Sequence, residues 1–138
     1  MKQLFNHINR YLVILVLGLL MISSCKKTAG EGGGASIKGK LWMQDWNNSF
    51  TFLESEYAAF DEDVYIIYGD DISYSQRIRS SYNGEFEFKY LRRGKYKIYF
   101  YSDDSTMQSS SGKVAVVKEV EIKKNNEQVD LGTTTIFK

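Results

Sequence analysis

The chain has 138 residues, and its 18 lysines and arginines nearly balance its 17 aspartates and glutamates, for a formal net charge of +1. This total charge lacks the strongly basic character typical of nucleic-acid-binding proteins, so no nucleic-acid partner is expected. One His and one Cys leave little material for a metal centre built from those side chains.

Residues 1–24 form a predicted signal peptide. Lys2 and Arg10 make its first part basic, residues 11–22 are an apolar run with a single Gly, and two serines precede Cys25. The run of about 12 apolar residues is shorter than the ~20 that a membrane-spanning helix needs. A removable export segment is therefore favoured over a permanent transmembrane anchor.

The sequence Met-Ile-Ser-Ser-Cys at 21–25 resembles a bacterial lipobox, with Ile22 at a position where Leu is commoner. The resemblance implies cleavage before Cys25 and lipidation of that residue by a diacylglyceryl group and, usually, a third acyl chain such as palmitate. Two or more acyl chains hold a protein stably on a membrane. Because no Asp follows Cys25, lipoprotein sorting implies the outer membrane of a Gram-negative bacterium, with the domain facing either the periplasm or the surface. The other interpretation is an ordinary secretory peptide with an incidental Cys.

Cleavage would leave 114 residues with 16 basic and 17 acidic side chains, since residues 1–24 include Lys2, Arg10 and the single histidine, His7. Without His, and with its one Cys acylated, that chain cannot form a Cys/His zinc site, a Ser-His-Asp triad or a Cys-His pair. Carboxylate chemistry would need two placed acids, whereas the acids here alternate along strands or lie in turns. We therefore expect no enzyme activity, no metal and no cofactor.

Residues 25–36 are predicted to be a lipidated tether. The stretch from Lys26 to Ser36 is Gly-rich and has no apolar periodicity, which is typical of a flexible linker. The folded domain is accordingly expected to span residues 37–138.

From Ile37 onward the pattern changes to short alternating segments. Predicted strands cover residues 37–43, 64–68, 72–79, 86–90, 96–100, 113–123 and 133–137. About seven short strands with turns every 8–12 residues favour an all-β sandwich. Gly39, within the first strand, indicates a bulge or a close approach of another part of the chain.

Two hairpins are predicted in the middle of the chain. Phe86 and Phe88 alternate with charged residues before Arg92-Arg93-Gly94, and Ile98 and Phe100 alternate with polar or aromatic residues after it. This period of two is typical of half-buried strands, so the two runs are predicted to pair across the turn. Asn83-Gly84 between alternating runs predicts a second hairpin just before them.

The middle of the chain also carries a wider pattern, Gly84-x-Phe86-x-Phe88-x-x-Leu91-x-x-Gly94-x-Tyr96. It resembles the transthyretin-like β-sandwich modules known as carboxypeptidase regulatory-like or Cna protein B-type domains, and the resemblance covers residues 37–137. It implies a seven- or eight-stranded Greek-key β-sandwich in which the aromatic and Leu positions are core and the two glycines allow turns. It also implies a noncatalytic role, because such domains serve mostly as spacers, stalk units or accessory domains.

A connection of some twenty residues, from Met43 to Asp63, is longer than this family usually has. Long inter-strand connections often carry function, and aromatic side chains are rich in binding energy at glycan and protein surfaces. Candidate ligand-binding residues are Trp42, Trp46, Phe50, Phe52 and Tyr57. The alternative is that these rings plug one end of the sandwich, or that residues 49–53 add an edge strand.

Two further features are predicted at the surface. The acidic clusters at 61–63, 70–71 and 103–104 lack the spacing of a calcium loop and are interpreted as solvated turn carboxylates. Tyr99 and Tyr101, with neighbouring lysines, form either an aromatic and basic strip or simple cross-strand pairs with Glu85 and Glu87.

The sequence thus predicts a membrane-attached, noncatalytic binding module whose partner is a glycan or an envelope protein. The alternative is a structural subunit that joins a surface or envelope assembly through its edge strands.

Overall fold

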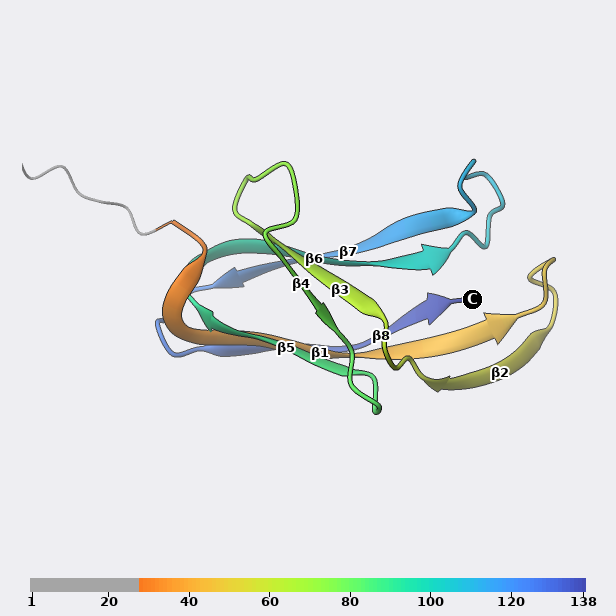
Figure 1. Ribbon diagram of the computed structural model, residues 1–138, viewed down its shortest axis with the longest axis horizontal. Coiled ribbons are helices and arrows are strands. Elements are labelled where there is room, and N and C mark those ends of the chain that lie inside the picture. Colours follow the sequence, from red (N-terminus) through yellow and green to blue (C-terminus); the bar gives the residue numbers. More distant parts are fainter. Residues whose placement is uncertain (1–27) are drawn as a thin grey trace, which may run out of the picture.

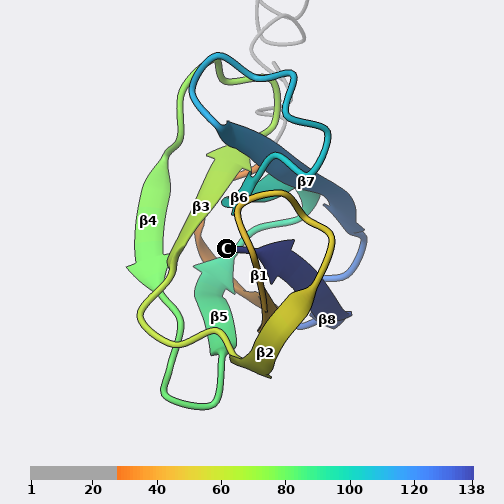
Figure 2. The same ribbon diagram turned by 90° about the vertical axis from the view of Figure 1, so that its right-hand side faces the viewer.

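The computed structural model describes residues 28–138, and these form eight β-strands in two layered sheets (Figures 1 and 2). The strands are β1 (Glu31–Trp46), β2 (Leu53–Ala58), β3 (Asp63–Tyr68), β4 (Gln76–Arg79), β5 (Glu85–Leu91), β6 (Gly94–Asp103), β7 (Lys113–Ile122) and β8 (Gln128–Phe137). The predicted all-β sandwich is confirmed.

The predicted signal peptide and Cys25 lie outside the described residues. Within residues 28–138, no helix has the length and apolar character needed to cross a membrane.

One sheet, which we call the β1 sheet, is built along the 16-residue strand β1. β2 and β5 pair with β1 antiparallel, at residues 42–46 and 31–40 respectively, and β8 pairs with it in parallel over residues 36–44. The register of β8 shifts between Lys38 and Lys40, at Gly39, and the ring of Phe86 lies 2.7 Å from where a Cβ of Gly39 would be. The close approach expected at Gly39 is therefore present, whereas the extra residue of the bulge lies opposite it in β8, between Asp130 and Thr133.

The second sheet, which we call the β6 sheet, has the antiparallel order β4-β3-β6-β7. Its strands alternate strictly, so that Val64, Ile66, Ile98 and Phe100 point inward and are at most 1% exposed. Together with Ile37, Leu41, Phe88 and Leu91 of the other sheet they form a continuous core. Burial of apolar surface at ~25 cal/mol per Å² between the sheets is the main stabilising contribution.

The predicted hairpins are wrong, although their strands are right. β5 pairs with β1, whereas β4 and β6 both belong to the β6 sheet, so the chain crosses between layers before and after β5. The period of two reports only that one face of a strand is buried, and strands that face one core from opposite sheets have the same period. Tyr90, with φ of 60°, turns the last part of β5 so that Leu91 rather than Tyr90 is buried.

The predicted tether is wrong for residues 31–36, which form the first part of β1. Ala35 is 1% exposed. A Cβ on Gly33 would lie 1.9 Å from the carbonyl oxygen of Leu91, and one on Gly34 would lie 2.3 Å from the Asn126 side chain. These glycines are required by close packing, whereas their composition alone indicated flexibility.

The long connection between β1 and β3 contains an edge strand, as one alternative predicted, but at Leu53–Ala58 rather than at residues 49–53. The strand predicted at 72–79 is shorter than expected, because only residues 76–79 pair with β3 and Ile72 is fully exposed in the preceding loop.

Candidate functional site

The five aromatic residues predicted to bind a ligand do not share one surface. Trp42 points outward from the β1 sheet, where the Lys40 Nζ lies 5.7 Å from its ring centroid and its Nε1 donates a 3.4 Å hydrogen bond to Glu56. Tyr57 lies opposite the inward-facing Met43 and packs against the core. These two rings therefore lie on opposite faces of the sheet.

The other three residues lie at the end of the sandwich where β1 turns into β2. The rings of Phe50 and Phe137 pack edge to face with centroids 6.1 Å apart, and the Trp46 backbone N–H donates to the carbonyl of Lys138. The Trp46 Nε1 is buried without a hydrogen-bond partner, whereas Phe52 is 66% exposed. Phe50 and Trp46 therefore lie beside the end of β8, but neither is among the residues that pack against the hydrophobic core, and the plug alternative stays a prediction.

A different set of aromatic residues gathers on the outer surface of the β6 sheet. Tyr65 of β3 lies directly across from Tyr99 of β6, and their rings stack with centroids 4.8 Å apart and an interplanar angle of 9°. Tyr74, from the β3–β4 loop, meets Tyr65 edge to face at 5.2 Å. Tyr101 meets Tyr65 at 5.9 Å and Tyr99 at 5.8 Å. We call these four residues the tyrosine face.

The tyrosine face is open to solvent. Tyr74 and Tyr101 are about half exposed, at 52% and 51%, while Tyr65 and Tyr99 are partly buried between them. Val117, the residue of β7 opposite Tyr99, is 50% exposed and extends the apolar surface. Four rings from three segments therefore form one connected aromatic surface that is not covered by any described part of the chain.

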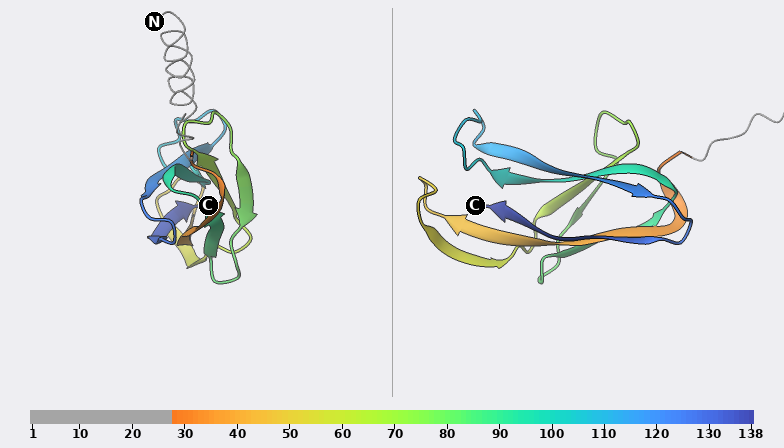
Figure 3. Two further views of the ribbon diagram at one scale, coloured as in Figure 1. Left: turned by 90° about the vertical axis from the view of Figure 1, so that its left-hand side faces the viewer. Right: turned by 180° about the vertical axis from the view of Figure 1, so that it is seen from behind.

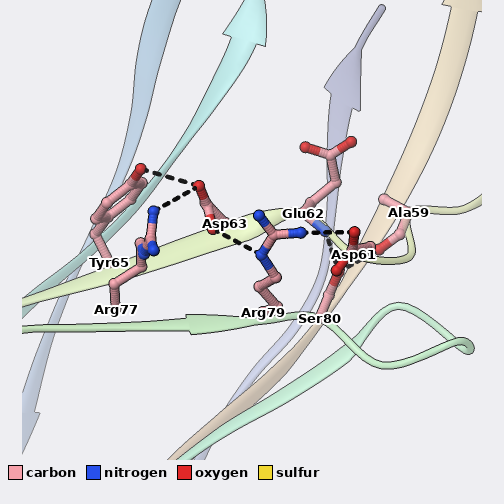
Figure 4. A network of polar contacts seen from close by, with 8 residues as sticks. All are labelled: Ala59, Asp61, Glu62, Asp63, Tyr65, Arg77, Arg79 and Ser80. Carbon is pink, nitrogen blue, oxygen red and sulfur yellow. Dashed lines mark hydrogen bonds and ion pairs between the residues drawn. The ribbon is translucent and has the colours of Figure 1, made fainter.

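A polar network holds one side of the tyrosine face (Figure 4). The Tyr65 hydroxyl donates to Asp63 Oδ2 at 3.3 Å, and Arg77 Nη1 donates to the same oxygen at 3.4 Å. Arg79 Nε lies 3.4 Å from the other Asp63 oxygen, an ionic contact, and Arg79 Nη1 donates to Asp61 at 2.6 Å. This network fixes the edge of the Tyr65 ring and places charged donors and acceptors beside it.

Charges around the tyrosine face are paired along the sheet. Lys95 lies opposite Glu121 and Lys97 opposite Glu119 on neighbouring strands, and Lys113 forms an ion pair with Asp103. Opposite charges placed across strands stabilise each other and cancel the net field. The surface that surrounds the rings is consequently close to neutral.

The central tyrosines are neutral at physiological pH. Burial raises the pKa of Tyr65, and the nearby Asp63 carboxylate raises it further. Burial also raises the pKa of Tyr99, to which the neighbouring tyrosines add. Both hydroxyls therefore remain hydrogen-bond donors and acceptors.

The sequence alone indicates two of the four residues of the tyrosine face. Tyr99 and Tyr101 were singled out, but the pairing considered for their strand, with Glu85 and Glu87, is wrong because β5 belongs to the other sheet. Tyr65 was missed, although its alternation with Val64 and Ile66 would have placed it on the outer surface. Tyr74 lies in a loop and carries no such signal.

The acidic cluster at 103–104 has an internal structural role. Asp104 accepts hydrogen bonds from the backbone N–H groups of Thr106, Gln108 and Ser109 and from the Thr106 hydroxyl, at 2.6–2.9 Å. These bonds, led by the Thr106 hydroxyl, lower the pKa of Asp104 to about 2. Among residues 28–138, no three His, Cys, Asp or Glu side chains are grouped so as to hold a metal ion.

The outer surface of the β1 sheet carries a second feature, an open hollow of about 440 Å³ above Gly39 and Gly132. Its rim is charged and partly paired, since Lys38 Nζ lies 3.7 Å from Asp130, and Glu85 and Glu87 face it from β5. The aromatic ring on this side of the molecule is that of Trp42, next to Lys40. The two outer surfaces therefore differ, one being charged and hollow and the other aromatic and neutral.

The chain has only distant similarity to known proteins. No protein-family model matches the chain and no curated protein matches it, so the transthyretin-like resemblance stays a prediction. A candidate carbohydrate binding protein from Pseudomonas aeruginosa has a similar crystal structure, with a TM-score of 0.45 and 15% identity over 81% of this chain and 92% of that one. A 9R-lipoxygenase from Cyanothece has a TM-score of 0.35 and 17% identity over 98% of this chain, which spans 23% of the lipoxygenase.

Proposed function

We propose that this protein is a lipid-anchored lipoprotein of the Gram-negative outer membrane and that its β-sandwich binds carbohydrate, without catalysis, on the tyrosine face. The observation that supports this proposal best is the connected surface of four tyrosine rings, two of them half exposed, on the outer side of the β6 sheet. The location at the membrane rests on the lipobox-like sequence at 21–25.

Carbohydrate suits such a surface for physical reasons. One side of a pyranose ring presents C–H groups, which are attracted to the electron-rich face of an aromatic ring, while its hydroxyls need polar partners at the edge. The outer tyrosine rings supply the first kind of contact. The Tyr65 hydroxyl, Asp63 and Arg77 supply the second, within one hydrogen-bonded group.

The paired charges of this surface favour neutral sugars over acidic ones. An acidic glycan needs unpaired cations, whereas each basic side chain near the rings already faces an acid: Arg77 faces Asp63 and Lys97 faces Glu119. We therefore expect a neutral polysaccharide or oligosaccharide to be the ligand.

The test is binding to soluble neutral polysaccharides (xylan, mannan and a β-glucan) and to acidic polygalacturonate, measured by affinity electrophoresis and calorimetry on the full chain in detergent. Replacing Tyr99 and Tyr101 together by Ala should weaken binding to at least one neutral polymer by tenfold or more, about 1.4 kcal/mol, because both stacking rings are lost. The Tyr101→Phe variant keeps the ring and should retain most of the affinity.

Trp42→Ala is the matched control, since it removes an outward ring from the opposite sheet. It should leave carbohydrate binding unchanged. Binding that depends on Trp42 and not on Tyr99 and Tyr101 would move the site to the β1 sheet, and binding to none of the polymers would contradict the proposal.

The membrane anchor has its own test. Cells that express the full chain are grown with a labelled fatty acid, and the protein should take up label and fractionate with the outer membrane, because Cys25 would carry the acyl chains. The Cys25→Ala variant should lose both properties. Equal labelling of the two chains would be evidence against the lipoprotein assignment.

A further inference from the structure

The four outer edges of the two sheets are protected to different degrees. β4 has only four residues and carries Arg77 and Arg79, and the edge formed by β2 and β5 is split between two short strands. β8 is interrupted at Gly132, where φ is 67° and the register shifts. β7, by contrast, pairs with β6 over ten residues without a register shift. Short strands, charges and bulges are the usual means of preventing edge-to-edge pairing, and β7 lacks a bulge and is long.

The backbone groups that β7 leaves open can be identified. The Asp104 N–H donates to the Gly112 carbonyl at 3.0 Å, so this pair is hydrogen-bonded and the next pair, Asp103 and Lys113, is not. By alternation, the odd-numbered residues of β7 direct their N–H and C=O groups away from β6. At the start of the strand, the Ser111 hydroxyl accepts a hydrogen bond from the Lys113 N–H and donates one to the Lys113 carbonyl. Free groups therefore begin at residue 115 and continue through 121.

The side chains along this edge are apolar at residues 114–117 and charged on either side, with Lys118 directly after Val117. Val117 is 50% exposed and Val114 is 38% exposed, and Ala115 lies between them. Lys113 begins the strand, and Glu119 and Glu121 lie near its end. The chain contains no Pro at all, so no proline blocks the edge.

We propose that β7 is a self-association edge, at which two copies of this chain pair antiparallel around Val117. In this register Lys113 of each copy lies opposite Glu121 of the other, which gives two ion pairs by symmetry, and Val114 lies opposite Val120. The residues whose free backbone groups face outward then lie opposite one another, as an antiparallel ladder requires.

Neighbouring registers are less favourable. A shift by two residues in one direction places Lys118 opposite its own symmetry copy and Lys113 opposite Lys123. A shift in the other direction keeps two ion pairs, now between Lys113 and Glu119, but it leaves Glu121 opposite Ser111 and removes the Val114–Val120 pairs. Like charges placed directly opposite destabilise a sheet, which disfavours the first shift, and the loss of the apolar pairs disfavours the second, so the register centred on Val117 is preferred.

Pairing in this way would join two β6 sheets into one continuous sheet of eight strands. Residues that lie opposite in antiparallel strands point to the same side, so the two tyrosine faces would lie on one surface, with Val117 of each copy between them. A long linear ligand could then contact both copies, although self-association is independent of whether carbohydrate binds.

The experiment is sedimentation velocity of the full chain in detergent over a range of concentrations, with circular dichroism to check the fold of each variant. The wild-type chain should form a dimer. Val117→Pro removes the outward N–H and should weaken association at least tenfold, while Val117→Thr, which keeps the N–H and the branched side chain, should still dimerise.

A charge exchange tests the register and remains informative if the Pro variant does not fold. Glu121→Lys alone should weaken the dimer about tenfold, since it opposes two lysines to two lysines, and combining it with Lys113→Glu should restore association. A wild-type chain that stays monomeric at its solubility limit, or a double variant no better than the single one, would overturn the proposal. Affinity for neutral polysaccharide, counted per chain, should be the same for the Glu121→Lys variant as for the wild type, because Glu121 lies opposite Lys95 and away from the four tyrosine rings. Failure of one proposal can therefore be distinguished from failure of the other.

Discussion

At the scale of single residues, Asp104 illustrates how one carboxylate can organise a loop. It lies at the end of β6, is 5% exposed, and accepts four hydrogen bonds from the loop that leads to β7. Bonds of this kind to a carboxylate are stronger than those between neutral groups, and they favour its ionised form. The loop therefore depends on the charge of this one side chain.

Asp104 gives a prediction about acid stability. Because its pKa in the folded protein, about 2, is below the ordinary value of 3.8, its contribution to stability is complete above about pH 4 and is lost as pH falls toward 2. Urea unfolding at pH 5 and pH 2.5 should show a smaller loss of stability for Asp104→Asn than for the wild type. Asp70→Asn, a change in another exposed turn, is the control and should behave like the wild type. Identical pH dependence in Asp104→Asn and wild type would contradict this role.

Tyr96 shows what the sequence can and cannot predict about a single residue. Tyr96 was correctly predicted to be core, and it is 1% exposed. Its hydroxyl accepts from the Gly30 N–H at 3.0 Å, a contact between residues 66 positions apart, and donates to the nearby Arg92 carbonyl at 2.6 Å. Alternation predicts that a side chain is buried, but it cannot predict which distant backbone its polar end will meet.

At the scale of elements, the strands were predictable and their partners were not. The strands at 64–68 and 113–123 are predicted almost to their observed bounds, because each has a strong alternating or β-branched pattern, whereas the last strand, predicted at 133–137, begins earlier, at Gln128. Partner choice depends on where the chain crosses between layers. At Tyr90 and Gly94 that crossing uses positive φ values, which have no signature in hydrophobic periodicity. The sequence could not predict the whole tyrosine face for the same reason, because Tyr65 and Tyr99 meet only when β3 and β6 are neighbouring strands.

The first part of β1 gives a prediction at this scale. Ala35 and Ser36 are adjacent, but Ala35 is 1% exposed and points inward, whereas Ser36 points outward. Ala35→Asp would bury a carboxylate without a partner and should cost several kcal/mol, about 3 or more, while Ser36→Asp should cost less than about 1. Thermal unfolding followed by circular dichroism measures both. Equal and small effects would mean that residues 31–36 are a tether after all.

At the scale of the whole molecule, β1 and β8 join the beginning and the end of the described chain. They pair in parallel from Ser36 with Gln128 to Gln44 with Phe137, and the inward residues Thr134 and Ile136 of β8 are buried. Such pairing brings together residues about ninety positions apart, so it is costly in loop-closure entropy and is expected to make folding slow. The sandwich is complete only when β8 has been added.

A truncation tests this dependence on β8. A chain that lacks residues 128–138 should lose cooperative unfolding and near-ultraviolet circular dichroism, because it leaves β1 without its parallel partner and exposes the core beneath Ile136. Replacing residues 47–52 by an equal number of Gly and Ser residues is the control, which changes a peripheral loop and should preserve a cooperative transition. A cooperative transition in the truncated chain would show that β8 is dispensable.

The parallel arrangement of β1 and β8 has a mechanical consequence. Because the two strands run in the same direction, the start of β1 and the C-terminal end of β8 lie at opposite ends of the molecule (Figures 1 and 3). Tension applied between these two points runs along the strands, and the hydrogen bonds that join β1 to β8 must then rupture together rather than one after another. A sheet resists force of that kind best, so the domain would resist extension when it is pulled between the start of β1 and the end of β8.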